Sequence, residues 1–426
     1  MKADVEAVYE AMSKEEKSCY AFVEMNIKNW DYFNAAYGLN TGDEVLEEIT
    51  KTLDNFLKNR GYWQRSYRET YHFFVLYSED ANEVLDNKML DSKVQDAFLM
   101  DLIDLLFDIP HPLLFHNVYM SFGILLPSEV NGPYNMLVNK ASIMRTNCPE
   151  LAKRSFCFEI YTQEKYQDYL LRIEQMRCIT HARMHDQFIY YIQPKIDIAT
   201  NKIIGGEVLL RWQDETGSII PTGEYIPYLN TFGEIYLIDL KTFRSVCTYL
   251  KEGLDQDQIR VPMSFNICAN NFGDHAFVSD YLSIAKEIGV PYSYIEFEFM
   301  EDIKFDQGNR VLEIIQGFKE AGFACSIDDF GRGNSSFAVL INSTLDTIKL
   351  DRLFFKEPLD DKRKQMIAHL VNMIKGMGMK VLAEGVETQE YVDFLKSISC
   401  DYIQGFYYYK PMPLEEFQVL LEQQND

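Results

Sequence analysis

The stretch that decides the fold is CSIDDFGRGNSS, residues 325–336. It completes a short apolar run, Ala324–Asp328, of the kind that forms a buried strand. The run leads into two adjacent aspartates, Asp328 and Asp329, and Gly331 follows as a turn residue. Turn chemistry alone would explain this pair, but carboxylates at the end of a buried strand also suit a functional site.

Short apolar runs of the same kind alternate with helical patterns on both sides of this stretch, over about 250 residues. Eight such runs with intervening helices predict an α/β fold, a TIM-like β/α barrel. The expected strands are Phe188–Gln193, Ile203–Leu210, Val261–Ile267, Tyr294–Phe299, Ala324–Asp328, Thr347–Leu350, Lys380–Ala383 and Tyr402–Phe406.

The first part of the chain mixes strands and helices in another order, which predicts a separate α+β domain over residues 1–162. A charged stretch over 163–177 is expected to form a connecting helix, with the barrel over 178–426. The elements expected in the first domain are a lead-in helix over 4–17, helices over 42–57, 99–107 and 138–145, and strands over 20–27, 71–77, 113–126 and 156–161.

The chain of 426 residues is acidic, with 41 Lys and Arg against 65 Asp and Glu and a formal charge of -24. Such a surface repels nucleic-acid backbones, so no nucleic-acid polymer is expected as a partner. The N-terminus lacks the apolar core of a signal peptide, and no apolar run reaches membrane-spanning length. We therefore expect a cytoplasmic protein. The eight cysteines show no zinc-binding spacing.

Polar residues gather where the expected barrel strands end, and β/α barrels place their sites at that end. Carboxylate and amide oxygens without His or Cys favour Mg²⁺ or Mn²⁺ over zinc. Adjacent aspartates suit two ions, because one carboxylate can bridge both. Any single member could be an ordinary solvated residue, but the set as a whole points to one place. Its members are Glu207, Asn266, Glu298, Asp328, Asp329, Lys349, Glu384 and Gln404.

Motifs in a consistent order show that residues from about 165 to 426 resemble the EAL domain, the family of cyclic di-GMP phosphodiesterases. The Glu-Ala-Leu signature of that family reads Glu207-Val208-Leu209 here, within EVLLRW. The other motifs are YIQP at 191–194, FNIC at 265–268, DDFGRGNSS at 328–336, KLD at 349–351, AEGVET at 383–388 and QGF at 404–406. The resemblance implies metal-dependent hydrolysis of cyclic di-GMP to linear pGpG.

The resemblance also implies residue roles and a homodimer formed through the barrel. The implied ligands of two Mg²⁺ or Mn²⁺ ions are Glu207, Asn266, Glu298 and Asp328 for one ion, and a bridging Asp328 with Asp329 and Glu384 for the other. The implied catalytic residues are Lys349, which would steady the attacking water and the developing charge, Glu384, Gln404 and Glu301, which would brace the loop after Asp329. The implied contacts to the dinucleotide are Gln193, Leu209 and Arg211.

The chain departs from the family pattern at a few positions. Val208 replaces Ala, Met300 replaces Thr, and Arg332 and Asn334 replace Thr and Tyr in the loop after the aspartate pair. The altered loop leaves open a second hypothesis, a receptor that binds cyclic di-GMP without cleaving it. A third hypothesis is a protein-interaction module that uses the barrel as a scaffold. The intact ligand set favours the hydrolase over both.

The N-terminal domain resembles the GGDEF diguanylate cyclase domain through MNIKNWDYFNAAYGLNTGDEVL, residues 25–46. Lys28 stands where that family has a metal-binding Asp, and the GGDEF hairpin aligns with ETYHF at 69–73, which lacks both glycines. This degenerate domain is therefore expected to make no cyclic di-GMP. Asn34 and Asp43 resemble guanine-reading residues, so GTP binding in a regulatory role stays open beside a purely structural spacer.

Overall fold

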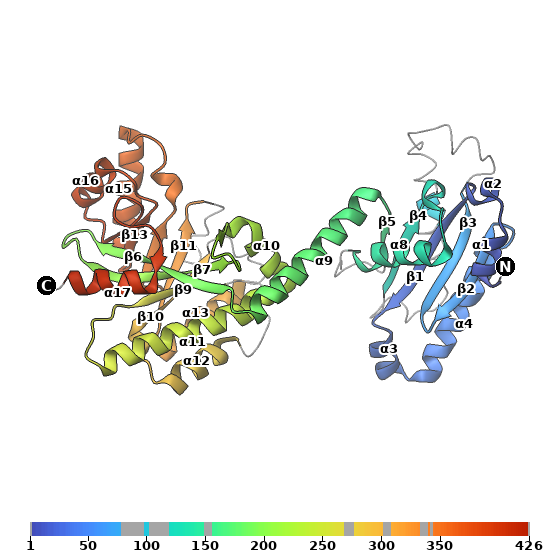
Figure 1. Ribbon diagram of the computed structural model, residues 1–426, viewed down its shortest axis with the longest axis horizontal. Helices are drawn as coiled ribbons and strands as arrows, with labels where there is room; N and C mark the ends of the chain where they lie inside the picture. Colours follow the sequence, from blue (N-terminus) through green and yellow to red (C-terminus); the bar gives the residue numbers. More distant parts are fainter. Residues whose placement is uncertain are drawn as a thin grey trace. The chain divides into compact units, whose positions relative to one another are not determined.

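The computed structural model describes residues 2–77, 98–101, 119–148, 156–267, 277–300, 308–332, 340 and 344–424. The chain forms two compact units, Met1–Ile173 and Glu174–Asp426, whose elements are labelled in Figure 1. The division falls inside helix α9 (Gln163–Met184), which extends beyond the connecting helix expected over 163–177.

The N-terminal unit is an α+β domain, as the sequence predicts. Its elements are α1 (Val5–Ala11), α2 (Lys14–Lys17), β1 (Tyr20–Lys28), α3 (Trp30–Tyr37), α4 (Leu39–Phe56), β2 (Gly61–Tyr67), β3 (Thr70–Leu76), β4 (Tyr119–Leu125), η1 (Pro127–Glu129), α8 (Tyr134–Thr146) and β5 (Phe156–Ile160). The sheet order is β2-β3-β1-β4-β5; β1 pairs antiparallel with β3 and β4, and β4 pairs parallel with β5.

Strand β1 is buried on both faces of this sheet. Val23 and Met25 belong to the apolar cluster that contains Val45 of α4. Phe22, which points to the other face, belongs to the cluster that contains Leu137 of α8. Side chains alternate between the faces of a strand, so a strand covered on both faces has an almost continuous apolar sequence.

The structure differs from the sequence-based expectation at the N-terminus, where two helices replace the single one expected over 4–17. The Ser13 hydroxyl accepts a hydrogen bond from the Glu16 backbone N–H, and the Glu16 carboxylate accepts one from the Ser13 N–H. This reciprocal capping box begins a new helix, α2, and so separates it from α1.

Helix α3 and strand β2 are absent from the sequence-based expectation. Gly61 suggests a break in the chain, but it is the first residue of β2. A Cβ atom at this position would come 1.9 Å from the Phe74 carbonyl oxygen of the neighbouring strand, so only glycine fits. Glycine is the residue that permits such a close approach of two strands. Most of the helix expected over 99–107 and the first residues of the strand expected over 113–126 lie outside the described residues.

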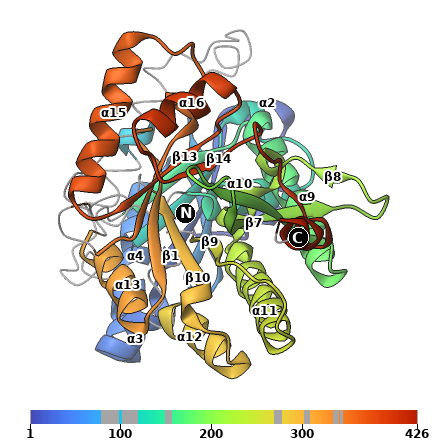
Figure 2. The ribbon, with the colours of Figure 1, turned by 90° about the vertical axis from the view of Figure 1, so that its left-hand side faces the viewer.

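The C-terminal unit is a closed eight-stranded barrel, which confirms the predicted fold class. Its elements after α9 are β6 (Phe188–Asp197), β7 (Ile203–Gln213), β8 (Ile219–Ile220), α10 (Thr222–Phe232), α11 (Glu234–Asp255), β9 (Met263–Ile267), α12 (Phe277–Ile288), η3 (Tyr292–Tyr294), β10 (Ile295–Met300), α13 (Gly308–Ala321), β11 (Ala324–Phe330), β12 (Thr347–Leu350), η5 (Arg352–Phe354), α15 (Asp361–Gly376), β13 (Lys380–Glu384), α16 (Gln389–Ser397), β14 (Tyr402–Gln404), β15 (Met412–Pro413) and α17 (Leu414–Gln423). The ring runs β6-β14-β13-β12-β11-β10-β9-β7 and closes by the pairing of β6 with β7. Helices α11, α12, α13, α15 and α16 lie around the outside of the strands (Figure 2).

One strand departs from the all-parallel arrangement of a TIM barrel. Strand β6 pairs antiparallel with both of its neighbours, β7 and β14, whereas the other strands of the ring pair in parallel. Its register places Gln193 opposite Glu207 and Lys195 opposite Gly205. The side chains of β6 therefore reach the barrel interior from a strand that runs against all the others.

Aromatic rings fill the space between the strands and the outer helices. Phe297 of β10 is fully buried, and its ring centre lies 4.1 Å from that of Phe318 on α13 and 5.2 Å from that of Tyr281 on α12. Large buried rings of this kind contribute much of the apolar burial in a core. The helices so attached are amphipathic, and no helix in the described part of the chain has both the length and the apolar character needed to cross a membrane.

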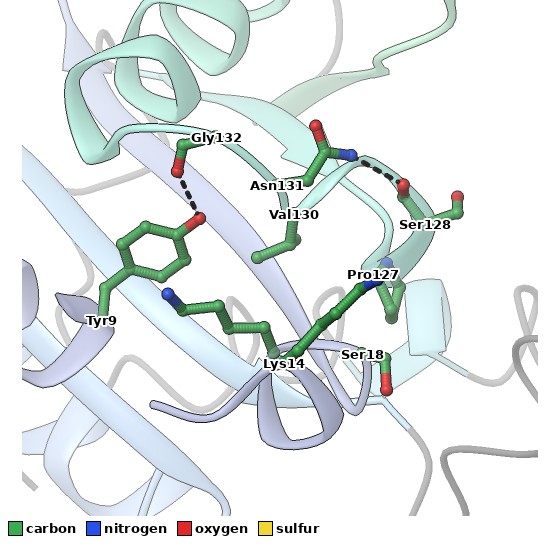
Figure 3. A pocket seen from close by; sticks show the side chains of 9 residues that line it. Tyr9, Lys14, Ser18, Pro127, Ser128, Val130, Asn131 and Gly132 are labelled. Atoms are coloured by element: carbon green, nitrogen blue, oxygen red, sulfur yellow. Dashed lines mark hydrogen bonds between the residues drawn. The ribbon is translucent and has the colours of Figure 1, made fainter. Parts of the chain in front are cut away.

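A cavity of about 420 Å³ lies in the N-terminal unit beside α1, α2 and η1 (Figure 3). The Tyr9 hydroxyl donates a hydrogen bond to the Gly132 carbonyl oxygen at 2.7 Å. The Lys17 ammonium lies 4.0 Å from the centre of the Tyr9 ring. Neither Asn34 nor Asp43 lines this cavity. It is therefore distinct from the nucleotide pocket that the GGDEF resemblance implies.

Candidate active site

A fully buried lysine stands at the centre of the barrel among four carboxylates. The Lys349 ammonium lies 2.7 Å from Glu384 Oε1, 3.1 Å from Asp328 Oδ2 and 3.4 Å from Glu207 Oε2, and its shortest contact is with Glu298 Oε2. The four acids come from β13, β11, β7 and β10. The structure thus brings together five of the residues that the sequence singled out.

Amide groups hold the Glu207 carboxylate on both sides. Its Oε1 accepts a hydrogen bond from Asn266 Nδ2 at 2.7 Å, and its Oε2 accepts one from Gln404 Nε2 at 2.6 Å. Gln404 Nε2 also donates to Gln193 Oε1 at 3.1 Å, and Gln193 Nε2 donates to the Tyr409 carbonyl oxygen at 3.2 Å. This chain of amides fixes the orientation of Glu207.

Burial and neighbouring charges act differently on these carboxyl groups. Burial alone would raise the pKa of Glu298, but Lys195 and Lys349 outweigh burial and hold that pKa at about 2. Burial raises the pKa of Glu207 and of Glu384, and neighbouring carboxylates raise both further while Lys349 opposes them. Because the lysines do not neutralise all the acids, the site favours uptake of protons or of a cation.

Two sets of carboxylates are spaced to hold divalent ions. One oxygen from each of Glu207, Glu298 and Asp328 lies within 4.8 Å of the others, and the same holds for Asp328, Asp329 and Glu384. Asp328 belongs to both sets, as expected of a bridging ligand. Sets made of oxygen ligands alone suit Mg²⁺ or Mn²⁺.

Asp329 occupies a bend of the backbone and has further charged neighbours. Its φ of 55° lies in the left-handed region. Burial raises the pKa of Asp329 and the contact with Asp351 raises it further, whereas Arg332 opposes both. The Arg332 guanidinium donates to Asp329 Oδ2 at 2.9 Å. This arginine therefore competes for an oxygen that the second carboxylate set would offer to an ion.

A cavity of about 520 Å³ adjoins the carboxylates, and Asn266, Leu209 and Arg211 line it. The Arg211 guanidinium lies 5.6 Å from the centre of the Tyr191 ring and donates through Nη1 to the Leu210 carbonyl oxygen at 2.8 Å. Two of the three expected substrate contacts, Leu209 and Arg211, thus face one cavity. The third, Gln193, lies beside Gln404 instead and does not line it.

Two ionisable residues near the site are absent from the sequence-based set. Asp239 of α11 lines the same cavity as Arg211, and burial raises its pKa to about 8. Lys195 of β6 is buried and contacts Glu298 at 2.8 Å. The signal for Lys195 is its place two residues after Gln193, on the same side of a strand. A helical aspartate such as Asp239 carries no comparable signal.

Some of the expected residues differ in position from the sequence-based expectation or lie outside the described residues. Glu301 lies outside the described residues, so its role as a brace stays a prediction. Met300, where the family has Thr, ends β10 and lines the cavity. Glu207 and Glu298 do not stand at strand ends but within β7 and β10, and they reach the cluster because alternate side chains point into the barrel.

In the N-terminal unit, the hairpin that aligns with GGDEF contributes a side chain to a buried network. His72 Nε2 lies 3.1 Å from Glu24 Oε2, and His72 Nδ1 lies 2.9 Å from the Tyr134 hydroxyl. Arg145 Nε donates to Glu24 Oε1 at 2.6 Å. The position that carries an acid in the GGDEF signature therefore packs against β1 and α8 here.

Comparison with known proteins agrees with this geometry. The family model described as "EAL domain" matches residues 176–411, which is more than half of the chain. The chain belongs to the EAL domain family. A second family model, described as "Diguanylate cyclase, GGDEF domain", matches residues 1–97. Both resemblances predicted from the motifs are thereby confirmed.

This EAL protein is similar to curated relatives over most of its own length. It is 25% identical over 415 residues to "Signaling protein YkoW" of Bacillus subtilis, across 94% of this chain and 49% of the relative. It is 26% identical over 408 residues to "Cyclic di-GMP phosphodiesterase PdeR" of Escherichia coli, across 93% of this chain and 58% of the relative. The chain spans about half the length of the curated relatives it matches.

Solved structures share the fold of the EAL part. "PaMucR Phosphodiesterase, c-di-GMP complex" matches with a TM-score of 0.54 and 26% identity, across 57% of this chain and 99% of that chain. "Crystal Structure of EAL domain Protein from Listeria monocytogenes EGD-e" matches with a TM-score of 0.52 and 28% identity, across 57% of this chain and 96% of that chain.

We predict that binding of Mn²⁺ releases protons. The raised pKa values of Glu207 and Glu384 mean that the metal-free site holds protons at a pH where ordinary carboxyl groups are ionised, and a metal ligand must be ionised. Affinity should therefore keep rising with pH above the range in which ordinary carboxyl groups ionise. Calorimetric titration at pH 6 in buffers of different ionisation enthalpy measures the proton count. Glu384→Gln should lower it, and a binding heat that does not depend on the buffer would contradict the prediction.

Proposed function

We propose that the barrel hydrolyses cyclic di-GMP to linear pGpG with the help of two divalent ions. The observation that carries this proposal is the sharing of Asp328 by two carboxylate sets around one buried lysine. Two ions bridged by a carboxylate are a recurrent arrangement for cleaving phosphodiesters. Support also comes from relatives that are named cyclic di-GMP phosphodiesterases, such as PdeR.

The proposed ligands follow from the two sets, with one amide added. Glu207, Asn266, Glu298 and Asp328 would hold the first ion, and Asp328, Asp329 and Glu384 the second. Bound Mg²⁺ or Mn²⁺ would supply charge to polarise the phosphate and to acidify a water molecule. The excess negative charge of the cluster, with raised pKa values at Glu207 and Glu384, fits such cations.

Residues of the chain would position the water and stabilise charge. Gln404 Oε1 is buried without a partner among the described residues, so it can accept a hydrogen bond from the attacking water. Glu384, 2.7 Å from Lys349, can orient the same water from the other side. The Lys349 ammonium would stabilise the negative charge that grows on the phosphate.

The cavity beside the carboxylates would take a guanine nucleotide. Arg211 offers a guanidinium to a phosphate or to a base edge, and the half-buried carboxyl group of Asp239 offers a hydrogen-bonding group to guanine. Leu209 supplies apolar contact in the same cavity. Gln193 would act through Gln404 rather than by lining the cavity.

Purified protein with Mg²⁺ or Mn²⁺ should convert cyclic di-GMP into pGpG, which chromatography resolves. Glu207→Gln keeps the side-chain volume but removes a charged ligand, so turnover should fall below about 1% of wild type. Failure to cleave with any divalent ion would overturn the proposed function.

The Lys349→Met variant should separate chemistry from metal binding. Removal of the ammonium leaves all the carboxylate ligands in place. The Mn²⁺ content, measured by mass spectrometry, should therefore be retained. The rate constant of hydrolysis should fall about 100-fold or more, because a preorganised positive charge is lost. Loss of bound Mn²⁺ from a folded variant would show instead that Lys349 has a structural role.

A second candidate function is a cyclic di-GMP receptor that does not turn its ligand over. The contact of Arg332 with Asp329 favours it, because the arginine competes for a ligand of the second ion. Calorimetry that shows tight binding of cyclic di-GMP, together with no hydrolysis in the assay above, would support the receptor. Measurable turnover would exclude it.

We propose that the N-terminal domain makes no cyclic di-GMP. Lys28 replaces an expected metal ligand, and His72 contributes to a buried network, so GTP added with Mg²⁺ should yield no product. A regulatory use of GTP remains the finer proposal, and it predicts a change in hydrolysis rate when GTP is added. Equal rates with and without GTP would leave the domain as a spacer.

Association as a homodimer through the barrel and a cytoplasmic location also remain proposals. The dimer rests on the EAL resemblance. Sedimentation at several protein concentrations tests it, and a fully active monomer at all of them would contradict it. Cell fractionation tests the location, and recovery in the membrane fraction would contradict it.

A further inference from the structure

Lys195 on β6 is a second buried lysine in the barrel, and nothing in the proposed reaction uses it. Its side chain is 4% exposed. The ammonium lies 2.7 Å from Glu296 Oε2 and 2.8 Å from Glu298 Oε1. A buried lysine is costly unless it is paired, and here two carboxylates of one strand, β10, provide the pairing.

The Glu298 carboxylate is held between two lysines. Lys195 occupies Oε1, and Lys349 occupies Oε2 from the other side. Glu298 is itself fully buried. A carboxylate with a different cation on each oxygen has little freedom to rotate, so the two lysines fix the plane of Glu298.

A glycine of the neighbouring strand packs beside the Lys195 side chain. Gly205 of β7 is the residue directly opposite Lys195. A Cβ atom on Gly205 would come 3.1 Å from the Pro262 carbonyl oxygen and 3.6 Å from Lys195 Cδ. The tight contact would be the one with the Pro262 carbonyl oxygen, whereas the contact with Lys195 Cδ would be an ordinary van der Waals contact.

The charge state of the group agrees with this role. Burial lowers the pKa of Lys195, but Glu296 and Glu298 more than compensate, so the pKa is raised and the ammonium persists. Lys195 also contributes to the low pKa of Glu298.

We propose that Lys195 is a positioning residue that aims Glu298 at the ion held by Glu207, Glu298 and Asp328. Residues behind a metal ligand commonly set its orientation and so its affinity. The inference depends on the proposed function in one respect, which is that this carboxylate set binds a metal ion. Glu296 is the second anchor that holds the ammonium in place.

The test is Mn²⁺ affinity by calorimetry in full-length Lys195→Met without substrate. Loss of the contact should weaken binding about 10- to 100-fold. In the hydrolysis assay, the Mn²⁺ concentration for half-maximal rate should rise, while KM for cyclic di-GMP stays unchanged and excess Mn²⁺ restores most of kcat. The matched control is Lys140→Met, which removes a buried lysine paired at 3.2 Å with Glu129 in the N-terminal unit and should leave Mn²⁺ affinity unchanged.

Lys195→Met leaves Glu296 without its partner and can fail to fold. The double variant Lys195→Met/Glu296→Gln removes both charges, so it should fold and still bind Mn²⁺ at least 10-fold more weakly. Glu296→Gln alone keeps the contact of Lys195 with Glu298 and should bind normally. Wild-type or tighter affinity in the double variant would overturn the proposal. If wild-type protein binds Mn²⁺ but cleaves nothing, the proposed function fails, while the affinities still decide the role of Lys195.

Discussion

The contact of one ammonium with four carboxylates determines the character of the barrel interior. Charges with little access to water interact strongly, so four acids that face one another from four strands would repel unless a cation stood among them. Lys349 is that cation. One ammonium does not neutralise four carboxylates, so the cluster favours binding of further positive charge. This excess of negative charge is what suits the barrel interior to a metal ion.

The amides around the cluster follow from the same constraint. A carboxylate that is left with one lysine at 3.4 Å needs other donors, and Glu207 finds them in Asn266 and Gln404. Gln193 extends this support to β6, the first strand of the barrel. The residue types at these positions are therefore explained by hydrogen bonding to Glu207 as well as by any contact with a ligand.

The sequence predicts the barrel and most of the cluster because both depend on local signals. Short apolar runs indicate buried strands, and polar residues within or after them stand out, as Asp328, Glu384 and Gln404 do. It does not predict the reversed direction of β6, which is decided by pairing with residues far along the chain. Asp239 is missed for the same reason, since only the packing of α11 brings it to the cavity.

In the N-terminal domain, a residue aligned with the GGDEF signature takes part in a buried hydrogen-bond network. Its hairpin keeps the backbone pairing, yet His72 points into the fold and meets Glu24, which Arg145 also contacts. Such a satisfied buried network stabilises the domain. Sequence comparison alone shows the loss of the signature, whereas the contacts show what replaced it.

The reversed direction of β6 has a consequence for how an upstream signal could travel. In a parallel barrel the preceding segment joins at the closed bottom, but Phe188 pairs with Trp212 near the open rim, so α9 joins there. Gln187 accepts a hydrogen bond from the Trp212 indole at 3.0 Å, and the residue before Trp212, Arg211, lines the cavity. A twist or a change of register in α9 would therefore act on the cavity wall through Gln187 and Trp212.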